Sequence, residues 1–408
     1  MGAVWRGARG VALSPRRFLV AAFGDAGHAF PVIALARALR GRGHEVLVET
    51  WERWREPVEA EGLGFTAAEE YKVFPPPTPG SPDGASAVDA ALALAPLMED
   101  FRPHAVVSDI LTVAPSLAAE RAGLPRATLI PHVYPVHEPG MPFFALGAQA
   151  PRTPMGRAMW RAWKPVLTTG LRRGRREMNE TRRAVGLKPL EGLHGVISDE
   201  LVLVATFPQL EYPRRWPRHV HVTGPMEFEL PCPVIALPPG EEPLVLVASS
   251  TAQDPELRLL RSALEALADE PVRVVATANR REPFGPLPAA PANAVVVDWL
   301  SYSQVMPAAA LVICHGGHGT VARALAAGTP ALCCPAAGDM AENSARAAWA
   351  GVGLMLPWRL MNAATVRWAT RRILGDRRFR EQARELAVWA RNHDGTERGA
   401  ALVERLAA

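Results

Sequence analysis

The sequence predicts an α/β protein built from two Rossmann-like, doubly wound domains with parallel sheets. Three observations indicate this class. Short continuous apolar runs alternate with helical patterns in both halves of the chain, which is typical of buried parallel strands joined by crossover helices. A length of 408 residues exceeds what one ordinary core holds, so two domains are expected. In the second half, a glycine-rich turn at residues 314–320 joins a strand pattern to a helix pattern.

The first half opens with a βαβ unit. Residues 18–23 form a short apolar run, as in a buried strand, and residues 24–28 form a loop. A helix follows, with Pro31 expected in its first turn, and a second strand is expected at residues 45–50. A crossover of this kind implies a parallel, right-handed arrangement. The later segments that continue the pattern are a strand at 105–108, a helix at 114–122 and a strand at 127–130.

Residues 151–188 break the alternation, because they are rich in arginine and helical in pattern. The favoured interpretation is a solvated helical insertion in which Trp160 and Trp163 are buried. The alternative is a lip close to a hydrophobic acceptor or to a membrane surface.

The proline- and glycine-rich stretch before residue 244 has no clear period and is expected to be a linker. The alternation then restarts with strands near 244–248, 272–276, 294–297 and 308–313, and with helices at 255–268, 303–309 and 321–327. The segment 364–408 is helical, with a break near 393–395. The expected organisation is a first domain at 17–225, a linker at 226–243, a second domain at 244–375 and helices at 376–408 that can pack back on the first domain.

Composition limits the class of partner. Hydrophobic residues make up 49% and charged residues 21% of the chain, as in a globular protein. The net charge of +4 is small, and no basic block is interleaved with aromatic residues, so nucleic-acid binding is not expected. Four cysteines without a CxxC pair favour a reducing compartment. No apolar run approaches ~18 residues, and residues 1–16 do not resemble a signal peptide, so we expect a cytoplasmic protein without a membrane span.

The turn Cys314-His315-Gly316-Gly317-His318-Gly319-Thr320 follows an apolar run and opens a helix. The first turn of a helix leaves N–H groups unpaired, and the helix dipole favours negative charge there. A histidine before the turn and a threonine at its end can grip the same anion. The turn therefore predicts a diphosphate site.

On these motifs the chain resembles the family 1 nucleotide-sugar glycosyltransferases of the GT-B fold, the type that modifies bacterial natural products. The resemblance is strongest over residues 298–356 and weakest over 135–220. It implies two Rossmann-like domains that face each other across a cleft, with the sugar donor on the second domain and the acceptor on the first.

The resemblance assigns donor contacts to the second domain. It implies diphosphate binding by the glycine-rich turn, stacking of the nucleobase on an aromatic side chain, and hydrogen bonds from sugar hydroxyls to an aspartate. The residues concerned are His315, Gly317, His318, Gly319, Thr320 and Thr251 for the diphosphate, Trp299 and Leu300 for the base, and Asp339 and Met340 for the sugar.

Other interpretations of these residues remain open. Residues 317–322 also match a GxGxxA dinucleotide fingerprint, but the acidic residue expected after the next strand is missing. His315 and His318 could be zinc ligands, although no further ligands stand at suitable spacing. Thr251 could be an ordinary loop residue, Trp299 a core residue and Asp339 a plain helix N-cap.

Two positions depart from the family pattern. Arg323 stands where the family usually has a glutamate that holds the ribose hydroxyls, and Met340 stands where it usually has a glutamine. Both changes suit a dTDP-linked deoxysugar better than UDP-glucose, which we state as a hypothesis.

In the first domain, His28 matches the catalytic histidine of the family and Asp109 the aspartate that orients it. Both follow predicted strands, and ligand sites of doubly wound sheets lie at strand carboxyl ends. An imidazole with a pKa near 6.5 can take a proton from an acceptor hydroxyl, and the carboxylate would fix its tautomer. Asp25 is a lesser candidate base.

The expected reaction is a single displacement with inversion at the anomeric carbon. No Asp-x-Asp triplet occurs in the chain, so neither a metal nor another cofactor is expected. The expected partners are a nucleotide-sugar donor and a small hydrophobic acceptor with a hydroxyl group, and a homodimer is possible. The residues expected around the acceptor are His132, Tyr134, Phe143 and Phe144. The alternatives are a nucleotide-sugar epimerase of the same fold, or a non-catalytic helper of another transferase.

Overall fold

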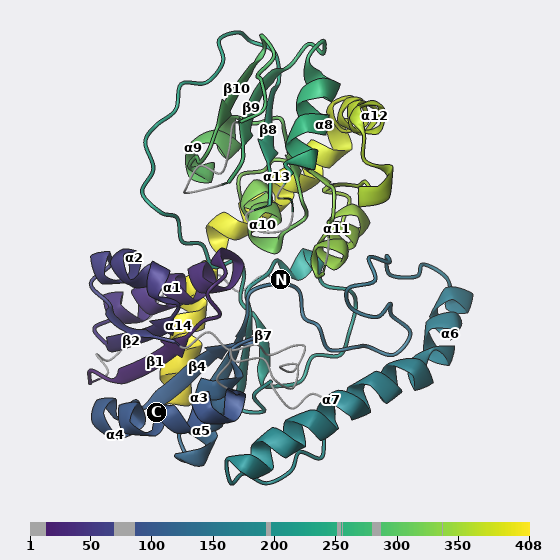
Figure 1. The fold of residues 1–408 in the computed structure, drawn as a ribbon. Helices are drawn as coiled ribbons and strands as arrows, with labels where there is room; N and C mark the ends of the chain where they lie inside the picture. The colour runs from purple at the N-terminus through teal and green to yellow at the C-terminus, as the bar shows by residue number, and fades with distance from the viewer. Residues whose placement is uncertain are drawn as a thin grey trace.

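The computed structural model describes residues 14–68, 86–192, 197–250, 254, 256–279, 287–336 and 338–408. Within these residues the chain forms two parallel sheets in two lobes, one from each half of the sequence (Figure 1). The α/β class with two parallel sheets is therefore confirmed.

The first sheet has seven strands, all paired in parallel, in the order β3-β2-β1-β4-β5-β6-β7. Its central strands are fully buried, which explains why they appear in the sequence as continuous apolar runs. The strands are β1 (Arg17–Ala21), β2 (Glu45–Thr50), β3 (Gly64–Ala67), β4 (Ala105–Asp109), β5 (Arg126–Ile130), β6 (Leu201–Val204) and β7 (Val220–Val222).

Helices cover both faces of this sheet. One core cluster lies between the sheet and the helices α1 and α14, and a second lies under α3 and α5. The helices of this lobe are α1 (Ala26–Gly41), η1 (Glu52–Trp54), α2 (Arg55–Ala60), α3 (Ala87–Ala93), α4 (Ala95–Phe101), α5 (Val113–Arg121) and η2 (Pro208–Leu210).

The expectation that Pro31 lies in the first turn of its helix is wrong. Helix α1 begins at Ala26, so Pro31 lies inside it. Because proline has no N–H, the carbonyl of Gly27 lacks its usual donor four residues on. The loop and the first turn are thus merged, and His28 belongs to the helix.

The second sheet has six parallel strands in the order β10-β9-β8-β11-β12-β13. Its two faces are covered by α10 with α13 and by α8 with α12, each pair enclosing its own apolar cluster. The strands are β8 (Leu244–Ala248), β9 (Arg273–Thr277), β10 (Ala294–Val297), β11 (Leu311–Cys314), β12 (Ala331–Cys333) and β13 (Gly353–Met355). The helices are α8 (Arg258–Leu267), α9 (Tyr302–Val305), η3 (Met306–Ala308), α10 (His318–Ala326), α11 (Met340–Trp349), η4 (Trp358–Leu360), α12 (Ala363–Leu374) and α13 (Arg377–Asn392).

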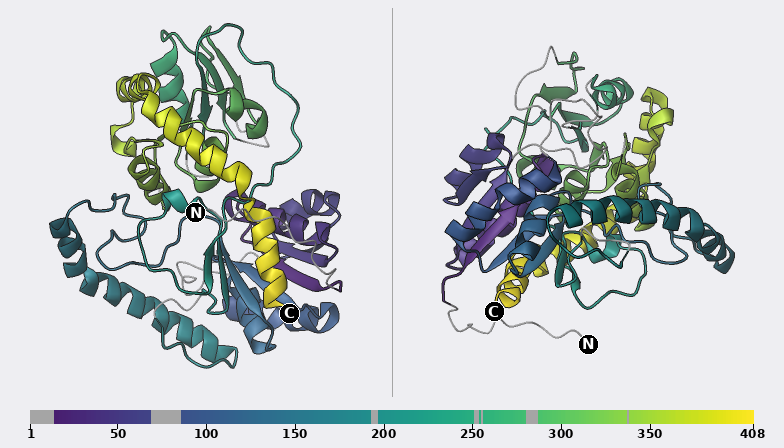
Figure 2. Two further views of the ribbon diagram at one scale, coloured as in Figure 1. Left: turned by 180° about the vertical axis from the view of Figure 1, so that it is seen from behind. Right: turned by 60° about the horizontal axis from the view of Figure 1, so that its bottom comes forward.

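The chain ends on the first lobe. Helix α13 lies on the second lobe, and α14 (Gly395–Leu406) then packs against α1 and β6 of the first (Figure 2). Glu404 on α14 accepts hydrogen bonds from Arg42 and pairs with His44, at 2.7 Å in each case. The break at residues 393–394 is therefore the point where the chain crosses between lobes.

Two helices form an arm beside the first lobe, α6 (Pro154–Ala162) and α7 (Lys164–Ala184) (Figures 1 and 2). Trp160 packs against Phe143, with ring centroids 5.7 Å apart. Trp160 is nevertheless only partly buried and Trp163 is 53% exposed, so the expectation that both tryptophans are buried is wrong. No helix of the described chain combines the length and apolar character needed to cross a membrane.

The strand order reverses direction between β1 and β4 in the first sheet and between β8 and β11 in the second. Ligands of doubly wound sheets bind at such switch points, beyond the strand carboxyl ends. The fold therefore points to the segments after β1, β4, β8 and β11.

Candidate active site

A cavity of about 370 Å³ lies between the lobes, and both contribute to its walls. The first lobe supplies the start of α1 and the segments after β4, β5 and β6, the segment that connects the lobes supplies residues near 225–230, and the second lobe supplies the switch-point turns. Most residues that the sequence predicted are in its lining, namely His28, His132, Trp299, Leu300, His315, Gly317, His318, Gly319, Thr320, Asp339 and Met340.

His28 and Asp109 meet at the switch point of the first sheet. The Nδ1 atom of His28 lies 2.8 Å from Oδ1 of Asp109, whose side chain is fully buried. The other carboxylate oxygen accepts hydrogen bonds from the backbone N–H groups of Phe23 and Leu111 and from the Thr112 hydroxyl. A carboxylate held in this way favours the tautomer with a proton on Nδ1, which leaves the Nε2 lone pair of His28 available to a substrate.

The surroundings of His28 raise its pKa. Burial alone would lower it, but the charge of Asp109 and the hydrogen bond to it outweigh burial, and Asp339 of the second lobe adds to the rise. The ring of His132 lies 6.2 Å away, yet burial lowers its pKa, and its Nδ1 donates to the carbonyl of Val133. One imidazole is thus suited to take a proton near neutral pH, and the other stays neutral.

The glycine-rich turn requires glycine for two reasons at one position. Gly316 has a φ of +81°, and a Cβ there would collide with the Ser344 hydroxyl and lie 3.0 Å from the Met340 carbonyl. Gly317 is the N-cap of α10, without a side-chain cap and without an acidic residue in the first turn. The N–H groups at the start of α10 therefore remain free to bind an anion.

The two histidines of the turn have different surroundings. His315 is buried to all but 9%, its imidazole lies against Gly317, and burial lowers its pKa. His318 points toward the first lobe, where its Nε2 lies 2.8 Å from the Thr206 hydroxyl, and burial lowers its pKa to about 3. The side chain of His318 thus joins the lobes, so any diphosphate contact of this residue falls to its backbone N–H.

Thr320 is held by a short polar chain. The Tyr302 hydroxyl hydrogen-bonds its side chain and accepts from Nδ2 of Asn279 at 2.6 Å. The same Asn279 group donates to the Ser249 carbonyl at 2.5 Å. Burial raises the pKa of Tyr302 to about 12, so its hydroxyl stays protonated beside Thr320.

Trp299 and Leu300 follow β10 and line the cavity. The loop after them is fixed from outside its own lobe, because Glu229 accepts hydrogen bonds from the Ser301 hydroxyl at 2.8 Å and from the Tyr302 N–H at 2.6 Å. Arg323 joins this contact, with a nitrogen 3.6 Å from Glu229 and a hydrogen bond to the carbonyl of Phe228. The position of the family glutamate is thus occupied by a cation turned toward the connecting segment.

Asp339 stands at the N-cap position of α11 but makes no capping hydrogen bond. Its carboxylate accepts instead from Nδ2 of Asn343 at 2.9 Å and lies on the cavity wall, beside Met340. The charge of Asp339 acts to raise the pKa of His28, so this carboxylate of the second lobe influences the histidine of the first.

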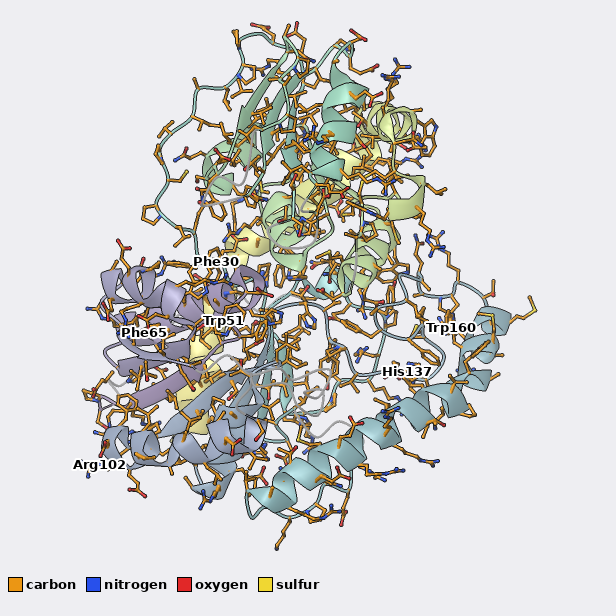
Figure 3. The ribbon with its side chains drawn as sticks, viewed as in Figure 1. Phe30, Trp51, Phe65, Arg102, His137 and Trp160 are labelled. Carbon is orange, nitrogen blue, oxygen red and sulfur yellow. The ribbon has the colours of Figure 1, made fainter. Side chains whose placement is uncertain are left out.

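The four residues expected around the acceptor do not all line the cavity. His132 lines the cavity, and Phe144 lies behind it with ring centroids 5.5 Å apart. Tyr134 packs on Trp216 and is not part of the lining. Phe143 packs against His137 and Trp160. Figure 3 shows Trp160 on α6. We therefore retain His132 and not Tyr134 or Phe143. Thr251 lies outside the described residues.

Among the cavity residues that sequence reasoning missed are Glu227, Glu229 and Asn279. Residues 226–230 alternate, since Met226, Phe228 and Leu230 are buried and the glutamates between them face the cavity. The alternation of apolar and acidic residues at 226–230 could have indicated these side chains from the sequence, although no strand forms there.

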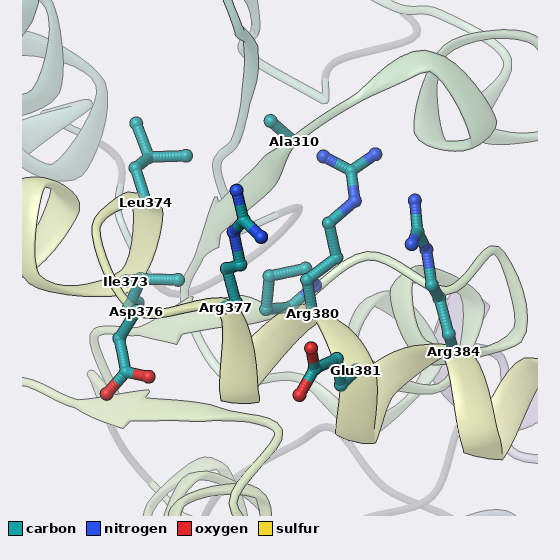
Figure 4. A pocket seen from close by; sticks show the side chains of 9 residues that line it. Ala310, Ile373, Leu374, Asp376, Arg377, Arg380, Glu381 and Arg384 are labelled. Atoms are coloured by element: carbon teal, nitrogen blue, oxygen red, sulfur yellow. The ribbon is translucent and has the colours of Figure 1, made fainter.

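A second cavity, of about 490 Å³, lies behind the second lobe along α13 (Figure 4). Arg377, Arg380 and Arg384 extend into it from one face of that helix (Figure 4). It holds no imidazole and no glycine-rich turn, so we do not regard it as the reaction site. Among the described residues, no three His, Cys, Asp or Glu side chains are grouped to hold a metal ion.

The second lobe matches a known protein family, and nearly the whole chain matches individual proteins. Residues 261–394 match the family model described as the C-terminal domain of erythromycin biosynthesis protein CIII-like proteins. The chain is 29% identical to 4'-demethylrebeccamycin synthase of Lentzea aerocolonigenes, over 91% of this chain and 94% of that protein. It is 28% identical to O-mycaminosyltylonolide 6-deoxyallosyltransferase of Streptomyces fradiae, over 96% and 97% of the two chains.

Solved structures share the fold over nearly the whole chain. The glycosyltransferase of kitacinnamycin has a TM-score of 0.76 at 20% identity, covering 96% of this chain and 99% of that one. The spinosyn rhamnosyltransferase SpnG complexed with thymidine diphosphate has a TM-score of 0.68 at 20% identity, with the same coverage. At this level of identity the likeness concerns the fold.

Proposed function

We propose that this chain, which is a GT-B glycosyltransferase of the natural-product biosynthesis type, transfers a deoxysugar from a dTDP-linked donor to a hydroxyl group of a small lipophilic acceptor. The anomeric configuration is inverted, with His28 as the base. The observation that carries the proposal is the His28–Asp109 pair in one cavity with the open N-terminus of α10.

In the proposed mechanism, Nε2 of His28 takes the proton of the acceptor hydroxyl as its oxygen attacks the anomeric carbon. Asp109 keeps the Nδ1 proton in place and stabilises the imidazolium that forms. The bond to the diphosphate breaks, and its growing negative charge meets the N–H groups at the start of α10 together with His315 and Thr320. A single displacement leaves no covalent intermediate, so the configuration inverts.

Two positions support a thymidine-linked deoxysugar. Arg323 is engaged with Glu229 and the Phe228 carbonyl, and it offers no carboxylate to a ribose. Met340 gives the sugar end of the cavity an apolar side chain, which suits a sugar with fewer hydroxyl groups. Two similar proteins, a 6-deoxyallosyltransferase and a rhamnosyltransferase complexed with thymidine diphosphate, agree with this choice.

The test is mass spectrometry of products formed from dTDP-deoxysugars and UDP-glucose with a panel of phenolic and polyketide acceptors. We expect products from dTDP-deoxysugars, and NMR of a product should show an inverted anomeric centre. The variant His28→Ala should lose transfer by about a hundredfold or more while it still binds dTDP.

Exclusive use of UDP-glucose would contradict the donor assignment. Conversion of the donor sugar without any acceptor would favour an epimerase, and retained transfer by His28→Ala would remove this residue from the mechanism. A chain that transfers nothing but activates another transferase would be a helper.

A further inference from the structure

The arm formed by α6 and the start of α7 exposes large apolar side chains. Helix α6 has no buried residue. The exposed fractions are 82% for Met155, 50% for Met159, 53% for Trp163 and 59% for Val166. Met155 and Met159 are one helical turn apart and share a face, and Trp163 stands at the junction with α7.

The far end of the arm is anchored. Arg182 forms a two-pronged ion pair with Glu120 of α5, at 2.6 and 2.7 Å, and the side chain of Asn179 bonds both backbone groups of Leu190. The α6 end stands away from the sheet (Figures 1 and 2). The exposed apolar residues are therefore carried on a fixed support rather than on a loose end.

The arm is also strongly basic. Residues 152–183 contain two acidic residues, Glu177 and Glu180, against one lysine and many arginines. In the described part of the chain, several of these cations are exposed and form no ion pair, namely Arg152, Arg157, Arg161, Lys164, Arg172 and Arg176. Cations beside an apolar face that includes tryptophan are the pattern of a helix at the surface of an anionic membrane.

We propose that α6 and the first turn of α7 bind the surface of an anionic lipid bilayer, with Met155, Met159, Trp163 and Val166 in the boundary between headgroups and acyl chains. The charge argues for this occupant. A second copy of the arm would bring like charges together, whereas anionic headgroups neutralise them. The inference uses no residue of the cleft and stands whether or not the proposed reaction is correct.

The test is co-sedimentation of the full chain with vesicles of phosphatidylcholine and phosphatidylglycerol in equal parts, compared with phosphatidylcholine alone. We expect binding to the mixed vesicles that weakens as salt rises. The double variant Met159→Ser/Trp163→Ser should bind at least about tenfold more weakly. The double variant Arg157→Gln/Lys164→Gln should lose about twenty-five-fold, because each cation contributes about a factor of five at such a surface.

Matched controls are available on the second lobe. Trp368 on α12 is 64% exposed, and Arg377 and Arg384 are exposed arginines of α13, so Trp368→Ser and Arg377→Gln/Arg384→Gln should bind like the unchanged chain. Thermal melting and dTDP binding should be equal in all variants. The proposal is overturned if mixed vesicles capture no protein, if the arm variants bind as well as the controls, or if the arm variants instead dissolve a dimer.

Discussion

At the scale of single residues, the cleft contains histidines whose pKa values are shifted in opposite directions. The buried carboxylate of Asp109 raises the pKa of His28, while burial without a carboxylate partner lowers the pKa of His315 and His318. A neutral histidine can donate or accept a hydrogen bond beside a diphosphate without changing charge. His28, in contrast, gains most from taking up a proton, which is what the proposed base needs.

Replacing Asp109 with asparagine should reverse the tautomer of His28. Three donors point at Oδ2, so the asparagine carbonyl must face them and its NH₂ group must face His28. Nδ1 then accepts, Nε2 carries the proton, and the base is disabled. We expect kcat to fall by about a hundredfold or more, with dTDP affinity unchanged.

The pH dependence of kcat/KM tests the direction in which the pKa of His28 is shifted. The base acts when it is unprotonated, so kcat/KM of the unchanged protein should rise as pH passes the raised pKa of His28, above 6.5. Asp109→Asn lacks the carboxylate that raises the pKa of His28, so the pH at which its residual kcat/KM rises should be lower.

Asp25 is a second carboxylate near His28 but lies outside the pair, so Asp25→Asn is the control and should change kcat less than about threefold. An equal loss of kcat in both variants would argue against a specific His28–Asp109 pair.

At the scale of elements, the sequence predicted strands where a segment carries its own local signal and missed the short strands β3, β6, β7 and β13. Residues 18–23 and 244–248 are continuous apolar runs and form the buried strands β1 and β8. The segment 226–230 was harder, because its alternation suggests a strand while it runs alone between the lobes. Its apolar residues pack in the first-lobe core, and Glu229 fixes the loop after β10. Contacts with residues of another lobe cannot be predicted from the local sequence pattern.

The crossing of α14 over the connecting segment depends on a glycine. A Cβ on Gly395 would lie 2.5 Å from the carbonyl oxygens of both Gly224 and Pro225, which are backbone atoms and cannot turn aside. A Cβ on Gly399, on the same helix, would meet the end of the flexible Met226 side chain at 2.6 Å. We expect Gly395→Ala to lower the free energy of unfolding by about 1–3 kcal/mol.

Gly399→Ala is the matched control and should cost less than about 1 kcal/mol, since Met226 can move and alanine favours the helix. Urea unfolding of both variants measures the difference. Equal stabilities would mean that the backbone contact at Gly395 relaxes freely.

At the scale of the whole molecule, each half of the sequence predicted its own sheet, and the family resemblance implied a facing pair. Nothing local predicted what joins them. Arg346 of α11 lies 2.7 Å from Glu211 of the first lobe and 2.8 Å from Glu342 of its own helix, with all three side chains almost fully buried. Glu211 also accepts from the backbone N–H of Tyr134. Arg346 and Glu211 lie far apart in sequence and neither belongs to a motif, so their pairing became visible only in three dimensions.

Removing the cation from this cluster should weaken the junction of the lobes. Arg346→Met leaves two buried carboxylates without a counter-charge, and burial already acts to raise the pKa of Glu342. We expect a loss of about 3–5 kcal/mol in the free energy of unfolding, measured by urea denaturation at neutral pH. Adding Glu211→Gln to Arg346→Met removes one of the two stranded charges and should recover part of that loss. If the double variant is no more stable than Arg346→Met, the ion pair between the lobes does not hold them together.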